Sequence, residues 1–201
     1  MQINIDRKTG VLLVIIALLG ATVISFAVNR DGDHMDKNGM GGHMSPNSTS
    51  ANYTGADIMF LQMMIPHHQQ AIDISNLAMK TSKDSELLAL AKKIATDQAA
   101  EIIQMKAWLN DAGAGMDMGH SMDGMGGMLN DAELSALNAE TGTKFDILWL
   151  KGMTGHHDGA IHMTTMIRDA SNPAIKAFGE KVIADQSAQI EQMKAMIKRL
   201  S

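Results

Sequence analysis

Methionine and histidine are the residues of this sequence most able to do chemistry, and many of them lie where no core can form. The 201 residues include 19 Met, 8 His and no Cys, and eight of the methionines fall in two Gly-rich polar segments, residues 31–52 and 113–128. Thioether sulfur is a soft, neutral ligand that selects Cu(I) or Ag(I), and imidazole binds Cu(I), Cu(II), Zn or Ni. The two segments therefore predict flexible metal-binding loops, with compositional drift as the alternative. Their candidate ligands are His34, Met35, Met40, His43, Met44, Met116, Met118, His120, Met122, Met125 and Met128.

A second set of donors lies in a block that occurs twice. Residues 60–72 align with residues 149–161, and residues 94–106 align with residues 182–194. In both copies a Met precedes a pair of His by three residues, so on a helix the thioether and an imidazole share one face. A hydrogen-bonded core histidine beside a core-filling methionine is the alternative interpretation, which the repetition disfavours. The candidate ligands of this set are Met64, His67, His68, Asp97, Glu101, Met105, Met153, His156, His157, His162, Met163 and Met193.

Composition and motifs argue against several other functions. The 17 Lys and Arg against 22 Asp and Glu give a net charge of −5, and the aromatic residues are four Phe, two Trp and one Tyr, which is atypical of a nucleic-acid binder. Without Cys there is no thiolate zinc site, disulfide or thiol nucleophile. No Glu stands three residues before a His, so the di-iron motif of helical bundles is missing. The sequence also has no glycine-framed serine and no phosphate-binding loop.

The periodicity of apolar residues indicates which elements position these donors. Each copy reads as helix, turn, helix, since apolar residues recur every three or four positions along its second helix. Two such hairpins bury their apolar faces by packing together, which predicts an all-α fold, a four-helix bundle made of two duplicated αα-hairpins. We place the bundle domain at residues 54–201, with repeat 1 at 54–110, a Met-rich loop at 111–128 and repeat 2 at 143–201.

Capping residues predict where three helices begin. Asp84 precedes the second helix of the first copy, and Asn172 followed by Pro173 occupies the matching place in the second copy. Asn130 and Glu133 have the spacing of a capping box, which predicts a short helix that bridges the two hairpins.

The N-terminal segment indicates export. Residues 11–28 carry no charge and follow Arg7 and Lys8, an arrangement that leaves the N-terminus in the cytoplasm and sends the rest of the chain across the membrane. The length of the apolar span favours an uncleaved transmembrane anchor, and a cleaved signal peptide is the alternative. We therefore assign residues 1–30 to a signal anchor or signal peptide and residues 31–53 to a flexible His- and Met-rich tether.

The repeated block carries a family resemblance. Residues 57–72 contain the order Phe-Leu-x-Met-Met-Ile-x-His-His-x-x-Ala-Ile, and together with residues 97–102 they resemble domain-of-unknown-function family 305, whose members include exported copper-binding proteins of the CopM type. The resemblance covers about residues 54–200 and implies a ferritin-like bundle, an extracytoplasmic location and copper binding by Met and His. The second copy departs from the pattern with Gly155 and Gln189. By position, the resemblance implies a first site at Met64, His67, His68, Asp97 and Met105.

These observations predict a membrane-tethered, extracytoplasmic helical bundle that binds copper. Cu(I) is favoured, Ag(I) and Cu(II) are open, and the expected role is sequestration, resistance or transfer to copper transporters or chaperones, without catalysis. The expected partners are the metal ion and, through the N-terminal helix, the membrane, with no nucleic acid. Two alternatives stay open: a redox enzyme acting on copper, and a metal-independent helical scaffold.

Overall fold

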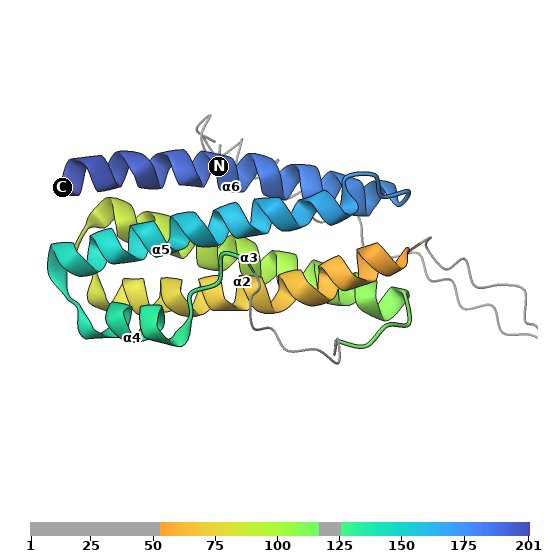
Figure 1. Ribbon diagram of the computed structural model, residues 1–201, viewed down its shortest axis with the longest axis horizontal. Coiled ribbons are helices and arrows are strands. Elements are labelled where there is room, and N and C mark those ends of the chain that lie inside the picture. Colours follow the sequence, from red (N-terminus) through yellow and green to blue (C-terminus); the bar gives the residue numbers. More distant parts are fainter. Residues whose placement is uncertain (1–52, 117–125) are drawn as a thin grey trace, which may run out of the picture. The chain divides into compact units, whose positions relative to one another are not determined.

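The computed structural model describes residues 53–116 and 126–201. The regular elements in these ranges are all helical, namely α2 (Gly55–Thr81), α3 (Ser85–Asp111), α4 (Asp131–Ala139), α5 (Gly142–Met163), the 3₁₀ turn η1 (Thr164–Ile167) and α6 (Pro173–Leu200). α2 pairs with α3 and α5 pairs with α6, and the two hairpins form the predicted four-helix bundle (Figure 1). Residues 1–52, which include the predicted signal or anchor helix and almost all of the tether, lie outside the described residues. In the part that is described, no helix is long and apolar enough to cross a bilayer.

The helix starts confirm the capping residues that the sequence predicts. The Asp84 carboxylate accepts a backbone N–H of the first turn of α3 at 3.0 Å. The Asn172 side chain accepts two backbone N–H groups at the start of α6, where Pro173 is the first residue. Asn130 and Glu133 form the capping box of the bridging helix α4. Because caps satisfy donors that the helix leaves open, they define where the long helices begin and which residues face inward.

The two copies differ where their first helix ends. α2 has 27 residues and runs unbroken through Pro66, whereas α5 has 22 and passes into η1. At this point the Thr164 hydroxyl donates to the carbonyl of Ile161 at 2.7 Å, and the Thr165 hydroxyl donates to that of His162 at 2.8 Å. Threonines that bond back to the preceding turn compete with regular α-helical geometry, which explains the shorter helix.

The apolar core consists of two clusters, each built from all four long helices. One cluster contains Ile74, Leu90 and Trp149, and the other contains Phe60 and Phe178. The indole N–H of Trp149 donates to the carbonyl of Ile74 at 3.0 Å, so its one polar atom is satisfied. Each large side chain that is fully buried here stabilises the fold by about 1.5–3 kcal/mol. Buried polar side chains lie on the middle turns of the helices, between the two clusters.

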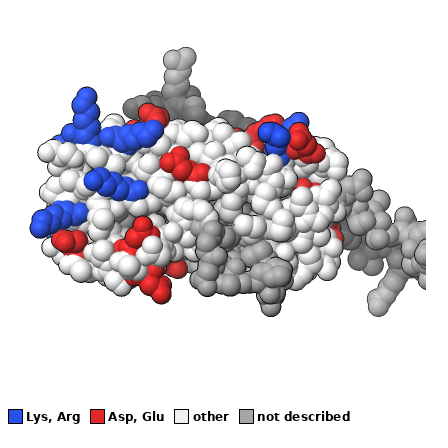
Figure 2. Space-filling view, viewed as in Figure 1, with Lys and Arg blue, Asp and Glu red and all other residues white. Residues whose placement is uncertain are grey.

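The charged side chains pair with one another near the end of the bundle where α6 finishes. Figure 2 shows Lys and Arg gathered at this end on one face, with acidic residues beside them. The Arg199 guanidinium lies 2.8 Å from the Asp84 carboxylate and 3.0 Å from that of Glu86. Lys198 and Arg199 also occupy the last turn of α6, where positive charge favours the helix dipole.

Candidate metal centre

Four histidines form a buried layer across the middle of the bundle, between the two apolar clusters. We name it the histidine layer. It consists of His67 and His68 on α2 with His156 and His157 on α5, and none of the four side chains has any exposed surface. Burial of an imidazole costs free energy unless its nitrogens make hydrogen bonds or bind a metal ion. The partners of these nitrogens therefore show what the layer can do.

His67 and His156 face each other across the contact between the two hairpins. Their ring centroids are 3.8 Å apart and the ring planes are inclined by 40°. His156 Nε2 lies 3.0 Å from the backbone carbonyl oxygen of His67. His67 Nε2 lies 3.4 Å from the carbonyl oxygen of Gly126, near the end of the Met-rich loop. His67 and His156, which occupy the same position in the two copies, are thus in direct contact.

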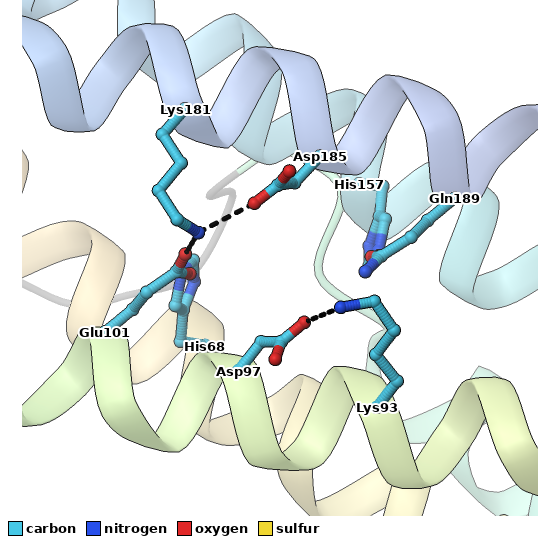
Figure 3. A network of polar contacts seen from close by, with 8 residues as sticks. All are labelled: His68, Lys93, Asp97, Glu101, His157, Lys181, Asp185 and Gln189. Atoms are coloured by element: carbon cyan, nitrogen blue, oxygen red, sulfur yellow. Dashed lines mark hydrogen bonds and ion pairs between the residues drawn. The ribbon is translucent and has the colours of Figure 1, made fainter. Parts of the chain in front are cut away.

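His68 and His157 turn the other way, toward the second helix of their own hairpins (Figure 3). His68 Nε2 lies 2.9 Å from the Glu101 carboxylate on α3. His157 Nε2 lies 2.6 Å from the amide oxygen of Gln189 on α6, the equivalent position in the second copy. Adjacent residues on a helix point about 100° apart, which explains why each pair contributes one ring to the centre and one to its own hairpin.

All four histidines use the same nitrogen in the same way. Each Nε2 faces an oxygen, and because carbonyl, amide and carboxylate oxygens accept, each Nε2 carries the hydrogen. Each Nδ1 is then an unprotonated acceptor, and all four Nδ1 atoms are buried without a hydrogen-bond partner. This is the arrangement of metal-ligating histidines, which donate one ring N–H to an oxygen and keep the other nitrogen for the metal.

Burial keeps most of the layer uncharged. It lowers the pKa of His67 to about 3 and that of His157 to about 4, and it holds the pKa of His156 well below its usual value. Repulsion from the neighbouring imidazoles lowers these values further. Neutral imidazole is the form that binds metals, so at neutral pH these three rings have no proton to lose before coordination.

A chain of charges connects His68 with the surface between α3 and α6. The Lys181 ammonium lies 2.8 Å from Glu101 and 2.7 Å from Asp185 (Figure 3). Partial burial raises the pKa of Glu101, but hydrogen bonds from His68 and Lys181 outweigh it and the net shift is downward. Burial likewise lowers the pKa of Lys181, and its bonds to Asp185 and Glu101 raise it by more. Glu101 is thus a carboxylate that accepts a hydrogen bond from a buried ring.

The second copy has no carboxylate in this place. Gln189 stands where the first copy has Glu101, and it accepts from His157 without a charge. Lys93, at the position that corresponds to Lys181, pairs with Asp97 on its own helix at 2.7 Å. The two halves of the histidine layer are therefore alike in geometry and unlike in charge.

Each long helix also carries a buried methionine, which belongs to one of the two apolar clusters. Met64, Met105, Met153 and Met193 are fully buried. In the described part of the chain, no three His, Asp or Glu side chains are spaced so that they could hold a metal ion together. An ion in the layer could therefore bind at most two such groups at once.

The remaining predicted ligands fall into three groups. Asp97 is half-buried and bonded to Lys93, His162 is exposed, and Met163 is buried in the apolar cluster with Phe60. Of the loop candidates, Met116 is exposed and Met128 is half-buried. The others lie outside the described residues, namely His34, Met35, Met40, His43, Met44, Met118, His120, Met122 and Met125.

Two buried glutamines near the histidine layer were not among the site residues predicted from the sequence. Gln98 and Gln186 occupy equivalent positions on α3 and α6, are almost fully buried, and each has an amide oxygen without a partner. They line a hollow of about 10 Å³ between these helices, which has room for about one water molecule. Their signal in the sequence is a glutamine within an apolar stripe, repeated in both copies.

Comparison with known proteins identifies the family of the chain. The family described as Domain of unknown function (DUF305) matches residues 57–197, which is more than half of the sequence. No match to a curated protein was found.

Several solved structures are similar to the bundle. A DUF305 protein from Streptomyces coelicolor, described as secreted, has a TM-score of 0.68 and 29% identity, and the match covers 72% of this chain and 92% of that one. A DUF305 fragment from Deinococcus radiodurans has a TM-score of 0.68 and 28% identity over 73% and 97% of the two chains. CopM in the Cu(II)-bound form has a TM-score of 0.60 and 32% identity over 72% and 97%. CopM in Cu(I)-bound and Ag-bound forms is also similar, at 30% identity each.

Proposed function

The chain belongs to the DUF305 family, and we propose that it binds a soft monovalent metal ion, Cu(I) or Ag(I), in the histidine layer. The observation that carries the proposal is the set of four buried Nδ1 atoms without a partner, one on each histidine. Leaving a buried acceptor unpaired costs about 1–3 kcal/mol. Four unpaired acceptors in one layer lower the stability of the metal-free fold, and an ion bound by two of them would remove part of that cost.

The charge and softness of the donors favour a monovalent ion. Burial keeps His67, His156 and His157 neutral at pH 7, and the four buried thioethers carry no charge at any pH. A divalent ion in this interior would bring two uncompensated charges, whereas Cu(I) or Ag(I) would bring one. Thioether sulfur also selects Cu(I) over harder cations. CopM, which is 30–32% identical, is known in Cu(I)-, Ag- and Cu(II)-bound forms, which supports copper or silver binding without distinguishing the charge of the ion.

We further propose an extracytoplasmic role in metal sequestration or transfer. The charge-free span of residues 11–28 supports export, and a relative described as secreted supports it independently. In this proposal the protein is a binder and not an enzyme, and it passes the ion to a copper transporter or chaperone. Anchoring by residues 11–28 stays a prediction.

Competition titrations test the proposal. The full chain would be titrated with Cu(I) and Ag(I) against chelators of graded affinity, and in parallel with Cu(II) and Zn. We expect a tight Cu(I) and Ag(I) site that disappears when His67, His68, His156 and His157 are all changed to Gln. The matched variant His162→Gln, which alters an exposed histidine of α5, should keep that site. Unchanged stoichiometry and affinity in the fourfold variant would exclude the histidine layer as the site.

A thermal melt separates a binder from a metal-independent scaffold. An ion that binds only the native state stabilises it by mass action, by about 2.7 kcal/mol at a hundredfold excess over Kd. We therefore expect Ag(I) to raise the melting temperature of the full chain, and we expect no rise in the fourfold histidine variant. Identical melts of the unaltered chain with and without Ag(I) would favour the scaffold.

A further inference from the structure

A short segment, residues 126–129, lies between α2 and α5 where the chain returns toward α4 (Figure 1). We name this segment the strap. The Gln70 side chain on α2 holds it at both backbone groups of one residue, since its Nε2 donates to the Leu129 carbonyl at 2.9 Å and its Oε1 accepts the Leu129 N–H at 2.8 Å. The Leu129 side chain is buried against Gly152 of α5, where an added Cβ would come within 3.0 Å of Leu129 Cδ2.

The strap also packs its backbone directly on the backbone of α5. A Cβ on Gly159 would lie 2.1 Å from the Gly126 carbonyl oxygen, and a Cβ on Gly127 would lie 2.7 Å from the Gly155 carbonyl oxygen. Gly127 has φ +89°, which side chains other than glycine rarely accept. A Cβ on Gly155 itself would meet nothing within 4 Å. The close approach therefore depends on Gly127 and Gly159 in particular.

The two residues that contact the strap most closely, Gln70 and Gly159, occupy the same position in the two copies of the repeat. With the offset of 89 residues, Gln70 of the first copy corresponds to Gly159 of the second. One copy supplies an amide that binds the strap, and the other supplies the space in which the strap lies. This is a physical reason for the two copies to have diverged at a position outside the core.

The strap lies over one half of the histidine layer. The Gly126 carbonyl oxygen is 3.4 Å from His67 Nε2, and the His67 ring stacks on His156. Both rings are fully buried. His68 and His157 instead bond to side chains of α3 and α6, away from the strap's contact with His67 (Figure 3).

We propose that the strap is a conformational gate which must leave α5 before a solute from solvent reaches His67 or His156. This inference rests on the proposed function only for the identity of the solute that enters. The strap is held by its own backbone and by one buried side chain, that of Leu129, so its release needs no change in the four long helices. The gate also restricts access to one histidine pair and leaves the pair beside α3 and α6 unaffected.

Histidine modification in the metal-free full chain tests the gate. Diethyl pyrocarbonate acylates neutral imidazole, and tandem mass spectrometry gives the rate at each of the four histidines. Amide exchange of Leu129 reports separately whether the strap is docked, because its N–H bonds to Gln70. Gly159→Ala drives a Cβ into the Gly126 carbonyl, and Gly155→Ala on the same helix is the matched control.

We expect Gly159→Ala to speed Leu129 exchange and the modification of His67 and His156 by about tenfold, the effect of losing one or two hydrogen bonds. His68 and His157 should keep their rates, and Gly155→Ala should match the unaltered chain. Gln70→Ala, which removes the clamp without adding an atom, should reproduce the result if Gly159→Ala folds poorly. Faster Leu129 exchange with unchanged reactivity of His67 and His156, or equal acceleration at all four histidines, would overturn the gate. The measurement uses no metal, so it can fail while metal binding stands, and the reverse also holds.

Discussion

Acid should unfold the metal-free protein through its buried histidines. The pKa of His67 is lowered to about 3, that of His157 to about 4, and that of His156 lies well below its usual value, in each case chiefly because burial disfavours the charged ring. In the unfolded chain the same rings take up protons near pH 6.5. Between these values the unfolded state binds more protons than the native state, so stability is fully present above about pH 6.5 and is lost as pH falls.

The size of the loss follows from these pKa values. At pH 5 an unfolded histidine is almost fully protonated, while native His67 and His157, with pKa values of about 3 and about 4, are mostly neutral, and the difference amounts to about 2 kcal/mol per ring. These two rings together lose about 4 kcal/mol, a large part of the stability of many domains. His156, whose pKa burial also lowers, adds to the loss in the same direction.

Urea denaturation of the chelator-treated chain at a series of pH values measures this loss. From pH 6 to pH 5 the free energy of unfolding should fall by up to about 3 kcal/mol through His67 and His157 alone, since each proton contributes about 1.4 kcal/mol per pH unit. His156→Asn should reduce the slope further, whatever its effect at pH 7. A stability that is flat between pH 7 and pH 5 would refute the argument, as would native histidine NMR signals at these three positions that titrate near pH 6.5.

Substitutions at three further residues test separate contacts. Glu101→Ala leaves the His68 N–H without an acceptor and should lower the free energy of unfolding by about 1–3 kcal/mol in urea, whereas Glu101→Gln, which keeps an oxygen there, should lower it by clearly less. Lys181→Met removes the two ion pairs of a half-exposed ammonium group, to Glu101 and to Asp185, and should lower the free energy of unfolding by no more than about 1 kcal/mol per pair. A larger loss would give these pairs a structural role that the exposure of Lys181 argues against. Met153→Leu conserves volume and should destabilise the fold by less than about 1.5 kcal/mol while weakening Ag(I) binding in a chelator competition, and equal Ag(I) affinity would remove this sulfur from the site.

The architecture could be predicted from the sequence because its signals are local. An apolar residue every three or four positions defines a helix face, and Asp84 and Asn172 mark helix starts by chemistry that involves only the next turn. The duplication then implied two equal hairpins, and two hairpins have few ways to bury their apolar faces. The burial of Met64 and His67, which the spacing places on one helix face, follows from the same periodicity.

The arrangement of the centre could not be predicted in the same way, because it depends on contacts between residues far apart in the chain. Sequence spacing places His67 and His68 about 100° apart but does not say which ring meets the other hairpin. The partner oxygens belong to Glu101, Gln189, Gly126 and the His67 backbone, between 32 and 89 residues away along the chain from the histidines they face. The early end of α5 also arises from side chain-to-backbone bonds that the repeat alignment conceals.

Imidazole ¹⁵N NMR with Ag(I) tests most directly whether the histidine layer is a metal site. Each ring should show one protonated Nε2 and one bare Nδ1 before metal is added. On addition of stoichiometric Ag(I), the Nδ1 signals of at least two of the four rings should shift and couple to silver, and the Nε2–H signals should stay. Saturating Ag(I) that leaves all four Nδ1 signals in place would show that the ion binds elsewhere and that these buried nitrogens serve another purpose.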